Sequence, residues 1–318
     1  MRLQQDIVSS LRCPVCKSTL ELSERGFLCT NTSCQATFPI VDGIPVLINE
    51  SASVFSIRDF TEHQNTFFQS RPNKVNQLIG KLLPTLDHNI STKKNYGKFA
   101  ELLAAEIRTP KVLILGGSIV GRGLDEILSH PSIQFIETDV SFGPRTALVC
   151  DAHNIPFDDR TFDGVIAQAV LEHVVDPYRC VAEIHRVLKD SGCVYAETPF
   201  MQQVHAGRYD FTRFTLLGHR RLFRRFEEIE SGAVDGPGMA LGWSYKYFVL
   251  SFARSRLLRS ILSGFARLTA FWLKYFDYYL IKKPGTLDAA SGFYFLGRKS
   301  DKTLSDKNLV SQYRGSFG

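Results

Sequence analysis

The sequence predicts an α/β protein with a mostly parallel sheet, preceded by a small metal-binding domain. Three observations support this: apolar and amphipathic stretches alternate from residue 111 onward, four cysteines cluster near the N-terminus, and a basic, aromatic stretch interrupts the alternation late in the chain. The 318 residues suffice for one large domain and a small appendage. The net charge of +6 is modest for this length, so the distribution of charge matters more than its total.

The first feature along the chain is a pair of cysteine motifs within residues 1–48. Cys13 and Cys16 form a C-x2-C motif, and Cys29 and Cys34 form a C-x4-C motif twelve residues later. Two tight turns can each present two thiolates to one tetrahedral Zn²⁺ ion. Four thiolates fill the coordination shell, so we expect a structural rather than a catalytic zinc site. The alternative is that these are unrelated core or free cysteines.

Residues 49–109 mix polar and apolar side chains, with Pro72 and Pro84 as breaks. Helices are predicted near 74–83 and 93–107, the second with an apolar face. Two interpretations stay open: the helices cover a ligand pocket, or they connect the domains and pack on the sheet.

From Lys111 to about residue 300, strands alternate with helices, which is typical of a parallel sheet covered by helices on both faces. We assign residues 110–300 to this domain, with a helical insertion over 236–287, and expect residues 301–318 to form a mobile tail. The predicted strands are 111–115, 133–138, 146–150, 162–168, 192–198, 226–231 and 292–297, and the predicted helices are 122–129 and 177–189.

The first predicted strand ends in a glycine turn, Gly116-Gly117-Ser118. Glycine lets the backbone approach a ligand closely, and the following helix would offer unpaired N–H groups. The second strand ends at Asp139, where an acid can accept hydrogen bonds from two ribose hydroxyls. Glu137 lies inside this strand and suits that role less well.

The stretch from Val149 to Pro199 resembles, residue type by residue type, the middle of class I S-adenosylmethionine-dependent methyltransferases of the small-molecule type. The resemblance implies a Rossmann-like, seven-stranded sheet whose last strand is antiparallel. It also implies that Asp151 and Ala152 meet the adenine, and that Gln168 lies beside the methionine end of the cofactor. Separately, residues 38–47 resemble the zinc ribbon of a small activator of tRNA and protein methyltransferases.

The glycine turn departs from that family. Ile114 stands where the family has an acid, and Ser118 and Val120 stand where it has glycines. The methionine ammonium group therefore lacks its usual acidic neighbour, and another group must replace it. A methyltransferase fold that no longer binds its cofactor is the alternative.

Two segments offer candidate catalytic residues. Leu171-Glu172-His173 resembles the family's turn after the fourth strand, where His173 is either structural or lines the pocket. A polar, aromatic loop follows Pro199, and ligands of open α/β sheets bind outside such strand ends. We predict His205 as general base, with Tyr209 and Asp210 as substrate contacts or orienting groups. The alternative is a loop ordered by its own hydrogen bonds.

The insertion has no acidic residue from Gly236 to Phe276 but six basic ones among many aromatics. No apolar run approaches the ~20 residues that span a bilayer. Basic residues among aromatics at helical spacing indicate interfacial helices on an anionic membrane, here over 243–283. A helical pair over the substrate site, a dimer interface and a surface for single-stranded nucleic acid are the alternatives.

These observations predict a methyltransferase that uses S-adenosylmethionine and a structural Zn²⁺ ion. The expected acceptor is an oxygen or nitrogen of a small or lipid-linked molecule of the sugar, polyketide or quinone type. An RNA methyltransferase whose ribbon contacts RNA is one alternative, and a non-catalytic scaffold is another. The N-terminal residues lack the apolar core of a signal peptide, so we expect a cytoplasmic protein, peripheral on the inner membrane face if the insertion binds lipid.

Overall fold

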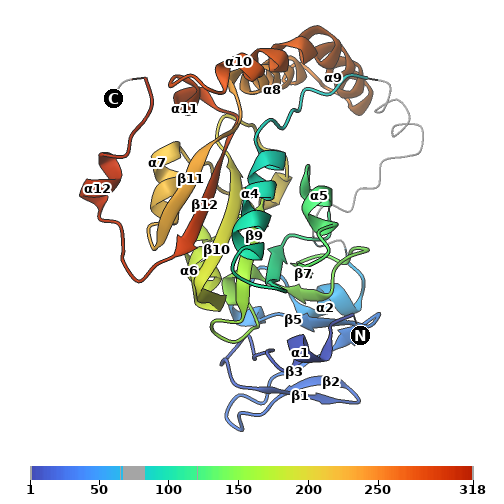
Figure 1. Ribbon diagram of the computed structural model, residues 1–318. Coiled ribbons are helices and arrows are strands. Elements are labelled where there is room, and N and C mark those ends of the chain that lie inside the picture. Colours follow the sequence, from blue (N-terminus) through green and yellow to red (C-terminus); the bar gives the residue numbers. More distant parts are fainter. Residues whose placement is uncertain (1, 65, 67–82, 120, 317–318) are drawn as a thin grey trace.

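The computed structural model describes residues 2–64, 66, 83–119 and 121–316. A three-stranded sheet near the N-terminus adjoins a nine-stranded sheet, and a group of helices covers the opposite end of the large sheet (Figure 1). The predicted helix at 74–83 lies almost entirely outside the described residues. The predicted helix at 93–107 is α4 (Thr92–Ala104).

The large sheet confirms the predicted α/β class and adds two strands to the seven expected. Its central strands are parallel, and β12 is antiparallel to both of its neighbours, as the family resemblance implied. In sheet order the strands are β11 (Phe226–Asp235), β12 (Gly292–Lys299), β10 (Leu188–Pro199), β9 (Phe162–Gln168), β6 (Lys111–Leu115), β7 (Gln134–Asp139), β8 (Leu148–Cys150), β5 (Ile44–Leu47) and β4 (Ile40–Val41).

Helices cover both faces of this sheet because successive side chains of its strands point to opposite faces. In β6, Val112 and Ile114 pack with α4, whereas Leu113 and Leu115 belong to the core on the other face. The first face also carries α5 (Leu124–Leu128), and the second carries α6 (Pro177–Val187) and α7 (Leu216–Leu222).

The N-terminal ribbon consists of α1 (Gln5–Val8) and the antiparallel strands β1 (Leu20–Ser23), β2 (Gly26–Cys29) and β3 (Thr37–Phe38). Beyond β3 the chain enters the large sheet, where β5 pairs in parallel with β8. Residues 40–47, which we expected within the ribbon domain, thus belong to the large sheet. The ribbon's apolar side chains share one core with that sheet and α6.

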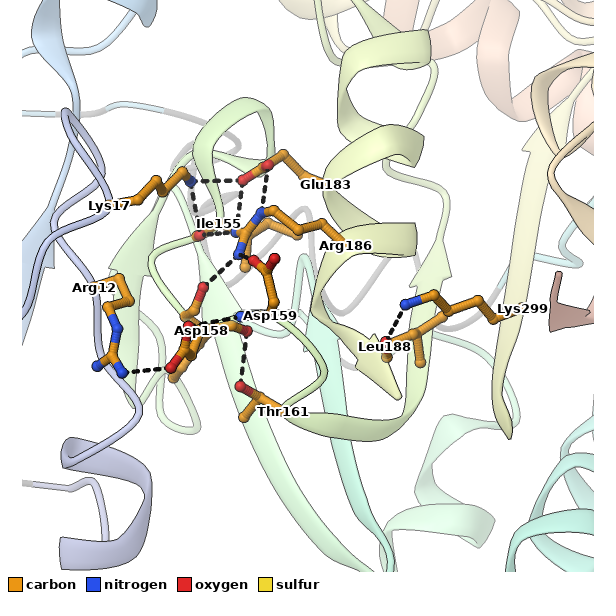
Figure 2. Close-up of polar contacts among 11 residues, drawn as sticks. Arg12, Lys17, Ile155, Asp158, Asp159, Thr161, Glu183, Arg186, Leu188 and Lys299 are labelled. Atoms are coloured by element: carbon orange, nitrogen blue, oxygen red, sulfur yellow. Dashed lines mark hydrogen bonds and ion pairs between the residues drawn. The ribbon is translucent and has the colours of Figure 1, made fainter. Parts of the chain in front are cut away.

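Polar contacts also join the ribbon to the large domain (Figure 2). Arg12 donates a hydrogen bond to Asp158, and Lys17 Nζ donates to Glu183 Oε2 at 2.8 Å and to the Ile155 carbonyl at 3.2 Å. Arg186 of α6 holds the same loop by donating to the Ile155 carbonyl at 2.7 Å. The contacts of Arg12 and Lys17 join residues more than 130 positions apart in the sequence.

The predicted insertion lies between β11 and β12 and is helical. Asp277 accepts hydrogen bonds from the backbone N–H groups of Gly238 (2.7 Å) and Met239 (2.8 Å). A carboxylate at this helix N-terminus satisfies N–H groups that lack helical partners. The insertion comprises α8 (Pro237–Leu250), α9 (Arg256–Ala270), a 3-10 segment (Phe271–Phe276), α10 (Asp277–Leu280) and α11 (Thr286–Ala289).

After β12, where we expected a mobile tail, the structure has α12 (Asp306–Val310) and contacts with the domain. Arg221 of α7 pairs with Asp306 at 3.1 Å, and Tyr313 donates to Asp288 at 2.6 Å. Remaining short elements are α2 (Ile57–Thr61) and the 3-10 turns Glu50–Ala52, Ala152–Asn154 and Gly207–Tyr209. No helix in the described part of the chain is long and apolar enough to span a bilayer.

Candidate active site

A cavity of about 520 Å³ lies at the carboxyl ends of β6, β7, β9 and β10. Its position follows the rule for open α/β sheets, and its volume suits a small-molecule ligand. Met239 and Trp243 of α8 line it, so the insertion forms part of the cavity wall. Phe55, between the ribbon and α2, lines it as well. Its other borders come from the predicted cofactor residues and from the loop after Pro199.

The glycine turn after β6 brings the backbone close to the ends of neighbouring strands. Gly116 has φ +75°, and a Cβ there would lie 2.6 Å from Val170 Cγ2. A side chain at Gly117 would come within 2.9 Å of Glu137 Cβ. Gly116 and Ser118 line the cavity. Two glycines are therefore required by the packing around this turn, although the family's later glycines are replaced.

Asp139 at the end of β7 lines the cavity, as its predicted role requires. Its Oδ2 accepts a hydrogen bond from the Ser118 backbone N–H at 2.9 Å. Burial raises the pKa of this carboxyl, while the Ser118 hydrogen bond opposes the rise. Glu137 instead forms a two-oxygen pair with Arg145 Nε, at 2.7 and 2.8 Å. The two acids of β7 thus differ in environment: Asp139 lines the cavity, and Glu137 is paired with Arg145.

Asp151 and Ala152, after β8, also line the cavity. Asp151 accepts hydrogen bonds from Ser53 Oγ and from His153 Nδ1, each at 2.5 Å. Burial raises the pKa of Asp151, but the hydrogen bonds from His153 and Ser53 outweigh it and bring the pKa below its usual value. His153 Nε2 in turn accepts from the Asp176 backbone N–H at 3.0 Å, which fixes the tautomer that donates to Asp151.

Gln168 at the end of β9 lines the cavity and contacts an acid that sequence reasoning missed. Its Nε2 donates to Glu197 Oε2 at 2.9 Å and to the Arg122 carbonyl at 3.1 Å. Its Oε1 is buried without a hydrogen-bond partner in the described part of the chain. A Cβ on Gly121 would lie 1.9 Å from that oxygen. Gln168 therefore occupies the space that a side chain at Gly121 would need, and its buried acceptor oxygen fits a bound polar ligand.

Glu197 and Asp235 are two further carboxyls of the cavity. Burial raises the pKa of both, and Asp235 Oδ1 has no hydrogen-bond partner among the described residues. The signal in the sequence was an acid inside an apolar strand, Tyr195-Ala196-Glu197, since a buried charge needs a partner.

The structure places the four predicted catalytic residues in two groups. His173 and His205 line the cavity, with ring centroids 5.0 Å apart, whereas Tyr209 and Asp210 do not line it. Asp210 pairs with Arg213 and accepts the His205 backbone N–H at 2.9 Å. Tyr209 stacks on Phe55, and its carbonyl accepts from His173 Nδ1 at 2.8 Å. Tyr209 therefore orients the ring of His173, and Asp210 holds the backbone of His205.

Burial lowers the pKa of His173 to about 4 and also lowers the pKa of His205. Both rings are therefore mainly neutral near pH 7, the state in which imidazole accepts a proton or binds a metal. Burial raises the pKa of Asp210, but the hydrogen bond from Arg213 outweighs it and brings the pKa to about 2. Asp210 is thus a fixed anion beside the loop.

The four ribbon cysteines converge as the motif spacing predicted. All four Sγ atoms lie within 4.8 Å of one another, with Cys13 and Cys34 separated by 3.9 Å and Cys16 and Cys29 by 3.4 Å. A tetrahedral ion with Zn–S bonds of about 2.3 Å separates its sulfurs by about 3.8 Å. The four thiols fit a structural zinc ion and are not joined as disulfides.

Residues 127–196 match the family model described as a methyltransferase domain. The chain contains a methyltransferase domain. The match runs from α5 through most of β10 and includes Asp139, Asp151, Ala152, Gln168 and His173. The glycine turn of this methyltransferase domain and the loop with His205 lie outside the matched residues.

Two curated proteins are similar to parts of the chain. A ubiquinone/menaquinone biosynthesis C-methyltransferase UbiE of Desulfotalea psychrophila is 33% identical over 90 residues, 28% of this chain and 33% of that protein. A demethylmenaquinone methyltransferase of Symbiobacterium thermophilum is 27% identical over 124 residues, 38% of this chain and 47% of that protein. The chain thus spans a third to a half of the length of these relatives.

Solved structures with a similar fold have low sequence identity. A Burkholderia thailandensis 1,6-didemethyltoxoflavin-N1-methyltransferase is 13% identical, with a TM-score of 0.41, and the alignment covers 85% of this chain and 98% of that chain. A Haemonchus contortus phosphoethanolamine N-methyltransferase 2 is 15% identical, with a TM-score of 0.44, and the alignment covers 65% and 53% of the two chains.

Proposed function

We propose that this protein is an S-adenosylmethionine-dependent methyltransferase acting on oxygen or nitrogen of a small or lipid-linked acceptor of the sugar, polyketide or quinone type. The observation that carries the proposal is the cavity of the methyltransferase domain, in which the predicted cofactor residues and two histidines share one space. The names of the two curated relatives support a quinone-type acceptor. The first is named a C-methyltransferase, so carbon is a further candidate for the acceptor atom.

The residues of the cavity suit this cofactor. Asp139 would accept hydrogen bonds from the ribose hydroxyls, and Asp151 would meet the adenine. Glu197 or Asp235 would face the methionine ammonium group, near the buried Gln168 oxygen. When bound, S-adenosylmethionine would supply an electrophilic methyl group at the histidine side of the cavity.

The histidines suit the removal of a proton from the acceptor. A neutral imidazole can take a proton from a hydroxyl or amine as that group becomes a nucleophile. His205 is our choice for this base because Asp210 and Arg213 hold its loop. Met239 and Trp243 of α8 would limit the access of water to the acceptor.

Calorimetry with S-adenosylmethionine and S-adenosylhomocysteine tests the proposal. We expect saturable binding of one molecule of each per chain. If neither binds, the chain is a scaffold with a methyltransferase fold, as in the second alternative. A strongly salt-dependent affinity for RNA that exceeds the affinity for small acceptors would favour an RNA methyltransferase instead.

The lipid-linked part of the proposal is supported by the outer surface of the insertion. Residues of α9 that are exposed to solvent include Leu257, Ile261, Phe265 and Leu268, whereas its buried positions are alanines. An exposed apolar helix face beside the cavity wall suits contact with lipid.

Between α8 and α9 lies a second cavity of about 390 Å³, lined by Lys246, Arg256, Arg259 and Arg267. None of the described residues that line it is acidic. Its position next to the apolar face suits an anionic lipid headgroup, since basic groups near a membrane surface bind anionic lipids.

A further inference from the structure

Three metal-ligating side chains meet in the cavity outside the predicted cofactor positions. Glu172 and His173 follow β9, and His205 comes from the loop after β10. Each offers one donor atom, and the three donor atoms lie within 4.8 Å of one another. All three residues line the cavity. The set is separate from the ribbon cysteines and contains no thiol.

Glu172 carries a buried carboxyl group with unsatisfied hydrogen-bonding capacity. It is 1% exposed, and its Oε2 has no hydrogen-bond partner in the described part of the chain. An unpaired buried carboxylate is costly unless a cation or proton compensates it. The carboxyl group therefore requires either a proton or a positive ligand.

Both histidines are oriented by backbone carbonyls. His173 Nδ1 donates to the Tyr209 carbonyl at 2.8 Å, and His205 Nδ1 donates to the Gln203 carbonyl at 3.3 Å. These hydrogen bonds put the protons on Nδ1 and leave Nε2 as the lone-pair atom of each ring. Metal-bound histidines are typically held by such a bond from their other nitrogen.

His173 Nε2 lies 3.6 Å from Glu172 Oε1. At this distance an imidazole nitrogen and a carboxyl oxygen can share a proton or a cation. A divalent ion held between them would also lie within reach of the His205 donor atom.

We propose that Glu172, His173 and His205 bind a divalent transition-metal ion in the cavity. Two imidazoles and one carboxylate are a known ligand set for Zn²⁺ and Fe²⁺, with further positions left for water or substrate. Those open positions would face the cavity.

The role of the ion rests on the proposed function. With the ion bound, His205 Nε2 would be a ligand and not the base, and the metal would activate the acceptor in its place. An acceptor hydroxyl bound to the metal would lose its proton to water more readily and become a better nucleophile for methyl transfer. The competing explanation is a proton shared between Glu172 and His173.

The test uses the full chain with zinc in the ribbon, titrated with Co²⁺ as a spectroscopic probe. We expect one Co²⁺ per chain, with visible bands of a nitrogen and oxygen site and without thiolate-to-metal charge-transfer bands. Glu172→Gln and His205→Gln should each weaken Co²⁺ binding more than about tenfold. His88→Gln alters a histidine of the same cavity outside the triad and should not.

Thiolate bands alone would place the ion in the ribbon and overturn the proposal, as would equal Co²⁺ affinity in wild type and Glu172→Gln. The two triad variants report independently, so failure of one to fold leaves the other informative. Binding of S-adenosylhomocysteine is measured on the same samples. Its loss without loss of the metal would count against the proposed function and not against this site.

Discussion

At the scale of single residues, burial determines which groups of the cavity carry charge. Glu172, with a pKa raised to about 8, and His173, with a pKa lowered to about 4, are both mainly neutral at pH 7. The pKa of Asp139 is raised by burial, whereas the pKa of Asp151 is lowered, since only Asp151 has enough hydrogen-bond donors to outweigh burial. The sequence identifies these side chains, but their protonation depends on neighbours that only folding provides.

Asp139→Asn tests the ribose contact. Because Asn can still accept the Ser118 N–H but carries no charge, we expect S-adenosylmethionine to bind about 10- to 100-fold more weakly with little loss of stability. Calorimetry measures the affinity and thermal unfolding the stability. Asp125→Asn, at an exposed position of α5, is the control. Unchanged affinity in Asp139→Asn would remove this residue from the cofactor site.

Because His219 of α7 is buried, we expect the stability of the fold to decrease in acid. Burial lowers its pKa to about 3, and its Nε2 has no hydrogen-bond partner among the described residues. The unfolded chain binds a proton at His219 below about pH 6.5, whereas the folded chain does not until about pH 3. Its contribution to stability is therefore complete above pH 6.5 and is lost as the pH falls toward 3. A tenfold change in proton affinity corresponds to about 1.4 kcal/mol, so the loss of stability reaches several kcal/mol.

We expect His219→Leu, an apolar replacement, to flatten the decrease of stability between pH 6.5 and 4, measured by urea unfolding. His63→Gln, at an exposed position, serves as the control and should follow the wild type. An equally steep pH dependence in His219→Leu would show that other groups cause the acid sensitivity.

At the scale of elements, we expect the ribbon and the large sheet to unfold together. The parallel pairing of β5 with β8 and the shared apolar core join them over a larger area than the few partly buried ion pairs between them. We predicted a domain boundary at residue 48 and did not foresee that β4 and β5 join the large sheet, because β4 has two residues and β5 has four. Such short strands carry too little periodic pattern to reveal their pairing partner.

Removal of zinc tests this cooperativity. Because Leu11, Phe27 and Phe38 pack in the same core as β9 and α6, loss of the metal should lower the unfolding temperature of the whole chain in a single transition. Calorimetric scans with and without a chelator, and of Cys34→Ser, measure it. A separate low-temperature transition with the main one unmoved would show that the ribbon folds independently.

At the scale of the whole molecule, the insertion both lines the cavity and forms an exposed surface. The insertion helices lie at one end of the large sheet (Figure 1). Met239 and Trp243 of α8 line the cavity, and other apolar and aromatic residues of the insertion are exposed. An acceptor held in lipid could therefore reach the cavity along one helical element. This arrangement is compatible with two of the sequence-based interpretations, a cover over the substrate site and a membrane-facing surface, and both stay predictions.

Flotation with vesicles tests the membrane part. We expect the protein to float with phosphatidylglycerol vesicles more than with phosphatidylcholine vesicles. Combined Leu257→Ser, Ile261→Ser and Phe265→Ser should reduce binding more than tenfold, because apolar area buried in lipid supplies much of the affinity. Leu22→Ser and Val310→Ser, at exposed apolar positions elsewhere, should leave it unchanged. Absence of wild-type flotation, with dimers in light scattering, would indicate an interface between copies of the chain.

The sequence by itself determined the features that depend on local pattern. Alternating apolar periods predicted the strands and helices, cysteine spacing predicted the four-sulfur cluster, and the glycine turn with Asp139 predicted residues that line the cavity, to which the family resemblance added Asp151. These succeed because a few neighbouring residues set backbone conformation and the end of a strand.

Only the tertiary structure decided which distant side chains meet. It left Tyr209 and Asp210 outside the cavity lining, brought His205 to Glu172 and His173, and placed Glu197 and Asp235 in the cavity lining. It also added β4 and β5 to the edge of the large sheet. The physical reason is that convergence depends on the path of loops and on pairing between segments far apart in the chain, which local periodicity does not encode.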